Sequence, residues 1–224
     1  MNGIDPLMTG RKALILLSIT EFCFMLIFSP IVYCLILPAP FTESDKSIIR
    51  TAPYGQYVRW KSTVSFAAFS ILLSAPVLIP AVYLMRWNVP LDDVLRLVTT
   101  FMLIGLGLSA LSRFSSAVFR DVFASITAVF FILAAGTGGV ILANPLIELA
   151  PAPEGIIYAT LLINPFVAVA SSIHFDVLRT DPLYYLSSIS AYQFHYPGLL
   201  QYWIFFGFTF IMLFIISIKY SENR

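Results

Sequence analysis

Residues 13–37 read ALILLSITEFCFMLIFSPIVYCLIL, an apolar run interrupted by one acidic side chain and no basic one. A bilayer core about 30 Å thick needs roughly 20 helical residues to cross it. This stretch is long enough for one membrane span, and its apolar region is far longer than that of a secretory signal peptide. It therefore predicts an integral membrane protein.

Four further stretches pass the same length test, namely residues 62–85, 92–112, 122–143 and 199–218. Of the 224 residues, 59% are hydrophobic and 11% are charged. An ordinary soluble domain has about 25% charged residues. We therefore expect an all-α fold, in which residues 1–224 form one polytopic transmembrane helix bundle with five full spans.

A sixth apolar run, residues 155–173, carries Asn164-Pro165 at its centre. Proline removes a backbone donor and turns the preceding residue away from helical geometry. We interpret the run as a re-entrant helical hairpin that enters the membrane from outside and returns. Such a hairpin is tolerated only where protein or a watery cavity shields its broken backbone. A kinked sixth full span is the competing interpretation.

Positive residues indicate the orientation, because Lys and Arg are retained in the cytoplasm. With five spans, the side of the C-terminus carries more of them: Lys46, Arg50, Arg59, Lys61, Arg113, Arg120, Lys219 and Arg224, against Arg11, Lys12, Arg86, Arg96 and Arg179. This favours a cytoplasmic C-terminus and an external N-terminus. Aromatic residues are then expected at headgroup level on the outer face: Trp87, Tyr184, Tyr185, Tyr192, Tyr202 and Trp203.

The longest polar link, residues 38–61, reads PAPFTESDKSIIRTAPYGQYVRWK. Thr51 is a good helix N-cap, and Pro53 is tolerated in the first turn. Three side chains then fall at i, i+3 and i+4 on one face: Tyr54, Tyr57 and Val58. The pattern predicts a short amphipathic helix on the membrane surface that continues into the next span. The simpler alternative is an interfacial anchor at the end of that span, held by Trp60 and Lys61.

At this link the chain resembles the permease subunits of type 2 ATP-binding-cassette (ABC) exporters. Their cytoplasmic loop has a charged cluster, a Thr-x-Pro step and a short coupling helix that ends in Lys. Within residues 43–61 the matching residues are Glu43, Asp45 and Lys46, then Thr51, Ala52 and Pro53, then residues 54–61. The sequence LSALSR at residues 108–113 is similar to the end of a span in that family. Asn164-Pro165-Phe166 is similar to its external re-entrant region.

The resemblance implies that two permease halves, identical or different, and two cytoplasmic ABC ATPase subunits form a transporter in the inner membrane of a bacterial cell. It implies coupling to the ATPase through Thr51, Ala52, Pro53, Tyr54, Tyr57, Arg59 and Lys61. The charged cluster is thinner here than in the family. The family also begins with an interfacial helix and a first span ahead of the segment matching residues 13–37. We therefore expect either a truncated reading frame or a partner that supplies the missing helix.

Chemistry within the chain itself is expected to be limited. A P-loop needs a Gly-Lys step to hold nucleotide phosphates, and the sequence contains no Gly-Lys dipeptide. We therefore expect no enzyme and no cofactor in this chain, with ATP bound by the partner ATPase. His174 and His195 lack the spacing of a metal site. The net charge of +1, with scattered basic residues, argues against a nucleic-acid partner.

Glu21 is the one acidic residue deep in a predicted span, with Ser18 and Thr20 close by in sequence. A charged carboxylate there costs about 2.5 to 3.5 kcal/mol, so it should face protein or water, or be protonated. We expect either a transport-pathway or proton-handling residue or a hydrogen bond between helices. Two other functions therefore remain open: a proton-coupled secondary transporter, and a non-transporting membrane scaffold or assembly protein.

Glycines recur inside two apolar runs, in Gly105-Leu-Gly107 and in Gly136-Thr-Gly138-Gly139. Small residues let helix backbones approach closely in membranes, so both groups indicate close helix packing. For the second group, local unwinding of the helix is the alternative.

Overall fold

The computed structural model describes residues 6–36, 90–119, 121–179, 183–192 and 194–222. Every regular element within these ranges is helical, as the composition predicted. The long helices are α1 (Pro6–Ile36), α4 (Leu91–Val118), α5 (Val122–Leu142) and α10 (Leu199–Glu222). The shorter ones are α6 (Asn144–Leu149), α7 (Glu154–Ile163), α8 (Pro165–Ser172), η2 (Val177–Arg179), α9 (Leu183–Leu186) and η3 (Ser188–Ala191).

Three helices are long and apolar enough to cross a membrane: Leu91–Val118, Val122–Leu142 and Leu199–Ser217. They coincide with the spans predicted at 92–112, 122–143 and 199–218. Helix α1 covers most of the predicted span 13–37, and its described apolar part is Leu14–Phe28. The span predicted at 62–85 lies outside the described residues. The chain is thus a helical protein with the character of a membrane protein.

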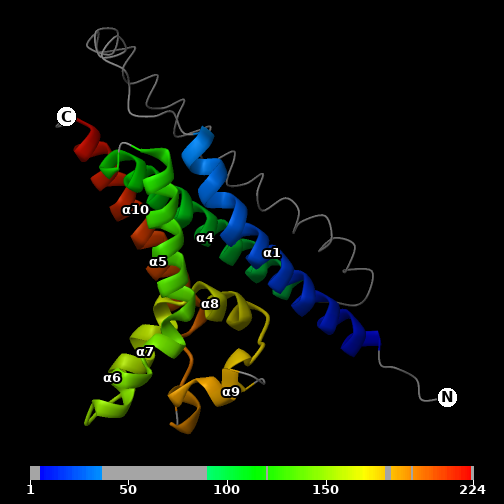
Figure 1. Ribbon diagram of the computed structural model, residues 1–224. Helices are drawn as coiled ribbons and strands as arrows, with labels where there is room; N and C mark the ends of the chain where they lie inside the picture. The colour runs from blue at the N-terminus through cyan, green and yellow to red at the C-terminus, as the bar shows by residue number, and fades with distance from the viewer. Residues whose placement is uncertain (1–5, 37–89, 120, 180–182, 193, 223–224) are drawn as a thin grey trace.

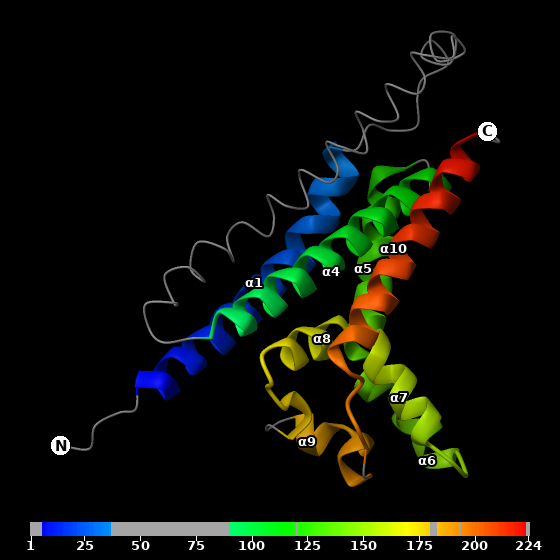
Figure 2. The same cartoon turned by 180° about the vertical axis from the view of Figure 1, so that it is seen from behind.

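The long helices form an elongated bundle (Figures 1 and 2). Helices α1, α4 and α10 run in one direction and α5 runs in the other, so the two termini lie at opposite ends. Helix α4 packs against α1, α5, α8 and α10 and is the most buried of the three apolar spans. The short elements α6, α7 and α9 gather at the end away from the C-terminus. We call the described residues from α6 to η3 the cap.

Hydroxyl groups inside the apolar helices are satisfied by their own backbone. Ser18 donates to the carbonyl oxygen of Leu14 at 2.7 Å, and Ser112 donates to that of Leu108 at 2.9 Å. An unsatisfied polar group in lipid costs several kcal/mol. Because this back-bonding supplies a partner one turn earlier, the polar residues do not interrupt the helices.

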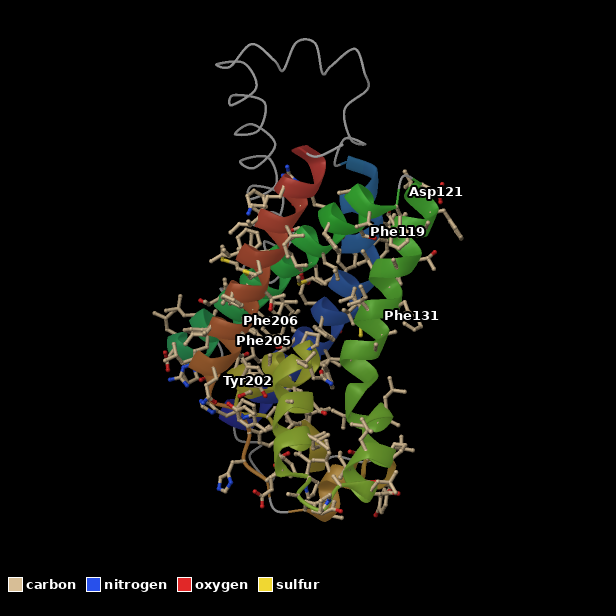
Figure 3. The ribbon with its side chains drawn as sticks, turned by 90° about the vertical axis from the view of Figure 1, so that its left-hand side faces the viewer. Phe119, Asp121, Phe131, Tyr202, Phe205 and Phe206 are labelled. Carbon is tan, nitrogen blue, oxygen red and sulfur yellow. The ribbon has the colours of Figure 1, made fainter. Side chains whose placement is uncertain are left out.

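The turn between α4 and α5 is closed by side chains. Asp121 caps α5, because its carboxylate accepts the amide hydrogen of Ala124 at 2.7 Å. Ser125 donates to the carbonyl of Phe119, and Ser115 donates to the carbonyl of Ser125. Figure 3 shows Phe119 and Asp121 at this turn, at the end of α5 away from the cap.

Two clusters of buried apolar side chains hold the molecule together. The first joins α1, α4, α5 and α8, and the second joins the end of α5 to the cap and to the start of α10. Phe166 and Phe206 pack against both clusters. Helix α8 contributes Val169 to the first and Val167 to the second, so this two-turn helix is the part of the cap that joins it to the bundle.

Candidate functional site

Helix α1 turns one stripe of side chains towards α4, α5 and α8. The buried members follow helical spacing: Leu14, Ser18, Glu21, Phe22 and Met25. Glu21 is only 7% exposed, and no residue that the structure describes forms a hydrogen bond with its Oε1 atom. The carboxyl predicted from the sequence as a transport-pathway residue therefore faces the protein interior.

The two hydroxyl residues near Glu21 lie on different faces of α1. Ser18 is buried, whereas Thr20 is exposed and donates to the carbonyl of Leu16 at 2.9 Å. Both hydroxyl hydrogens are used by the backbone, so neither is available to Glu21. A carboxyl group in this setting can hold a proton or accept a hydrogen bond from a donor group that enters the bundle.

Close contacts fix the rotation of α1. The ring of Phe22 lies 5.4 Å from that of Phe166 on α8. A Cβ atom added at Gly105 on α4 would lie 3.2 Å from Cε of Met25, whereas one added at Gly107 would meet nothing within 4 Å. Of the two glycines in this group, Gly105 is therefore the one that allows α1 and α4 to approach closely.

The sixth apolar run forms two helices, α7 and α8, which bend by 80° at Asn164-Pro165. Asn164 is buried at the break, and its side chain forms hydrogen bonds with both α8 and α5. Its Oδ1 atom accepts the amide hydrogens of Phe166 at 2.9 Å and Val167 at 3.2 Å, which caps α8. Its Nδ2 atom donates to the carbonyl of Thr137 on α5 at 2.8 Å. Protein groups therefore satisfy the broken backbone, as a re-entrant element requires.

The second glycine group lies where α5 meets this bent pair. A Cβ atom at Gly136 would lie 3.9 Å from Cδ of Pro165, and one at Gly139 would lie 3.7 Å from Cγ2 of Thr160. Helix α5 continues without a break through these glycines to Leu142. A Cβ atom at either position would make an ordinary van der Waals contact, so the helices lie near each other here without requiring glycine, and the alternative of local unwinding is not seen.

The aromatic residues expected at headgroup level differ in exposure. Tyr202 is fully buried in the second apolar cluster, so its ring is not free to contact lipid headgroups as predicted. Trp203 is half-buried and its indole nitrogen donates to Thr100 on α4 at 3.0 Å. Tyr185 and Tyr192 are exposed. The first turn of α10 is covered by the cap, so its tyrosine packs inwards (Figure 3).

The LSALSR sequence lies within α4, where Ser109 and Ser112 are buried. The guanidinium carbon of Arg113 lies 5.1 Å from the ring centre of Phe214 on α10, a cation–π contact. This end of α4 is therefore tied to α10, far from the cap.

The residues predicted to couple to an ATPase lie in the 37–89 range, outside the described residues. They are Thr51, Ala52, Pro53, Tyr54, Tyr57, Arg59 and Lys61. Among the side chains that are described, no group of three or more His, Cys, Asp or Glu residues could hold a metal ion. His174 and His195 lie in different loops, on either side of α9.

No protein-family model, curated protein or solved structure matches the chain. Its class therefore rests on the helices themselves, which are those of an all-α membrane protein.

Proposed function

We propose that the chain is the transmembrane permease subunit of a type 2 ABC exporter, forming the substrate pathway and coupling to a separate cytoplasmic ATPase. The observation that carries the proposal is the bent pair α7–α8, broken at Asn164-Pro165 and placed between the long helices α5 and α10. The resemblance implies a re-entrant element at this position in the chain order. The break supports that implication, because its backbone groups are bonded to protein rather than left for solvent.

In this proposal two such chains, or this chain and a related one, pair in the inner membrane of a bacterium. The C-terminus lies in the cytoplasm and the cap lies outside. Five spans then cross the membrane, and α7 and α8 enter and return. ATP remains on the partner ATPase, and the chain has no catalytic role of its own.

Coupling would begin at residues 51–61. Closure of the ATPase dimer would push on this segment and move the span that follows it. Helix α8 packs against α1, α4, α5 and α10, so movement among the spans would also displace α8 and open the pathway at the cap.

The experiment is purification of the tagged full-length chain from its native host in a mild detergent. We expect a P-loop ATPase at stoichiometric amounts. Tyr57→Asp should reduce its recovery at least tenfold. Tyr185→Asp is the matched control, because Tyr185 is exposed in the cap, which the proposal puts on the outer side, away from the ATPase. Recovery of the chain without any ATPase would contradict the proposal.

A proton-coupled secondary transporter is the second candidate, and the buried carboxyl of Glu21, whose Oε1 has no described partner, favours it. Proteoliposomes with a pH-sensitive dye inside would report proton movement while a compound library is offered. In this alternative Glu21→Gln abolishes the movement, and Glu154→Gln, at an exposed cap position, leaves it intact. Absence of any compound-dependent proton movement would count against it.

A further inference from the structure

The end of α8 has an unusual backbone. The amide of Phe175 donates to the carbonyl of Ala170 at 2.9 Å, and that of His174 donates to the carbonyl of Ser171 at 3.2 Å. This is a Schellman-type ending, in which the residue after the helix is usually glycine. His174 takes the position with φ of 54°, the one non-glycine positive φ in the described ranges. Strained backbone positions of this kind cluster at functional sites.

The imidazole of His174 reaches the start of α4. Its Nε2 atom lies 3.0 Å from NH1 of Arg96 and 4.0 Å from Oδ1 of Asp93. Arg96 also forms an ion pair with Asp92 one turn earlier. Both views of the ribbon show the end of α8 beside the start of α4 (Figures 1 and 2).

The 3.0 Å contact can be a hydrogen bond in only one protonation state of the ring. A guanidinium group can only donate, so Nε2 must be the acceptor and the imidazole must be neutral, with its hydrogen on Nδ1. When a proton from solution binds Nε2, this nitrogen can no longer accept from Arg96, and two positive groups then face each other. The Asp93 carboxylate becomes the favourable partner.

We propose that His174 is a proton-operated switch that exchanges its partner on α4, from Arg96 when neutral to Asp93 when protonated. A charge-assisted hydrogen bond is about 2.8 Å long, so the two atoms, 4.0 Å apart, must approach each other by about 1 Å. A histidine side chain changes charge between about pH 5 and 8, which is the physiological range of pH. The exchange involves only α4 and α8, so it holds whether or not the chain exports a substrate.

The neighbouring charges give both positive groups an acidic partner once His174 is protonated. On α4 these are Asp92, Asp93 and Arg96, and Arg96 keeps Asp92 as its partner when His174 leaves it. On the loop after α8, Asp176 accepts the hydroxyl hydrogen of Tyr196. Among the side chains that the structure describes, the other helices packed on α8 carry these titratable residues: Glu21 and Cys23 on α1, Glu154 and Tyr158 on α7, and Tyr202 and Lys219 on α10.

The test is a pair of double-mutant cycles on the full chain in lipid nanodiscs. Amide hydrogen exchange at the end of α8 is measured at pH 8 and pH 5 and corrected for the intrinsic pH dependence of exchange. His174→Asn is the first variant, because asparagine tolerates the left-handed backbone. It is combined with Arg96→Gln in one cycle and with Asp93→Asn in the other.

At pH 8 we expect His174 to couple to Arg96, and at pH 5 to Asp93, with each coupling worth a two- to five-fold change in exchange, or about 0.4–1 kcal/mol. His195→Asn is the matched control: it removes an exposed histidine from the loop before α10 and should leave the exchange of partners unchanged. Coupling to the same residue at both pH values, or to neither, would overturn the proposal. If His174→Asn does not fold, the single variants decide: the effect of Arg96→Gln must be larger at pH 8 than at pH 5, where only its ion pair with Asp92 is lost, and the effect of Asp93→Asn must be larger at pH 5.

Discussion

Replacing Asn164 by alanine should release α8 from α5. The side chain accepts two amide hydrogens at the start of α8 and donates one hydrogen bond to Thr137. Loss of an N-cap costs about 1 kcal/mol, and loss of a buried hydrogen bond costs about 1 kcal/mol more. The sum of about 2 kcal/mol corresponds to about thirty-fold more frequent opening of α8.

Hydrogen exchange measured by mass spectrometry on the full chain in lipid nanodiscs would detect this opening in peptides that cover α8. Asn164→Ser separates the two contributions, because serine keeps the cap and loses the bond to Thr137. It should raise exchange about five-fold. Asn144→Ala is the matched control, since Asn144 also precedes a proline but bonds to Leu186 and Ser188.

Asn144→Ala should therefore raise exchange around residues 186–188 and leave α8 protected. The reasoning would be refuted if α8 exchanged at the wild-type rate in Asn164→Ala. It would also be refuted if Asn144→Ala exposed α8 equally.

Three further predictions concern contacts elsewhere in the molecule. Gly105→Leu should destabilise the chain by about 1–3 kcal/mol, because the added atoms overpack the contact with Met25. Gly107→Leu should not destabilise it, because nothing lies within 4 Å of the added Cβ atom. Thermal unfolding in detergent compares the two variants. Trp203→Phe and Thr100→Val should each lower the stability of the folded chain by about 1 kcal/mol. Because both remove the same hydrogen bond, the double variant should lose less than the sum of the two, and the same thermal assay measures all three. Burial, and then the hydrogen bond to Asp176, raise the pKa of Tyr196 above its ordinary value. Above about pH 10 the unfolded phenol releases a proton that the folded one retains, so stability falls as pH rises, and Tyr196→Phe should make this fall shallower in denaturant titrations.

The sequence was informative where local chemistry decides the structure. Apolar length alone located three helices within a few residues of their ends, and α4 exceeds its prediction only because residues 113–118 extend the helix to the turn capped by Asp121. The break in the sixth apolar run followed from Asn164-Pro165, because proline cannot continue the preceding hydrogen-bond pattern. The all-α class followed from the same reasoning.

The composition could not predict which face of each helix is buried, or which residues far apart in the sequence contact each other. Hydropathy makes Tyr202 an interfacial residue, but the cap folds over the first turn of α10 and buries it. The contact between Arg96 and His174 joins residues 78 positions apart, and no periodic pattern links them. For Glu21 the cost of a charge in lipid predicted that it faces protein or water, or is protonated; it did not predict which helices the side chain would face.

Site-directed labelling of single cysteines tests the central claim most directly: that the cap lies on one side of the membrane and the coupling segment on the other. In a background with Cys23 and Cys34 replaced by alanine, cysteines at Arg59, Glu154 and Ala191 would be treated with a membrane-impermeant maleimide in intact cells. We predict labelling at Glu154, the first residue of α7, and at Ala191, which follows the bent pair α7–α8, and no labelling at Arg59 until the cells are opened. Labelling of Ala191 and Arg59 together on one side, with Glu154 on the other, would show that α7 and α8 cross the membrane, and would contradict the account.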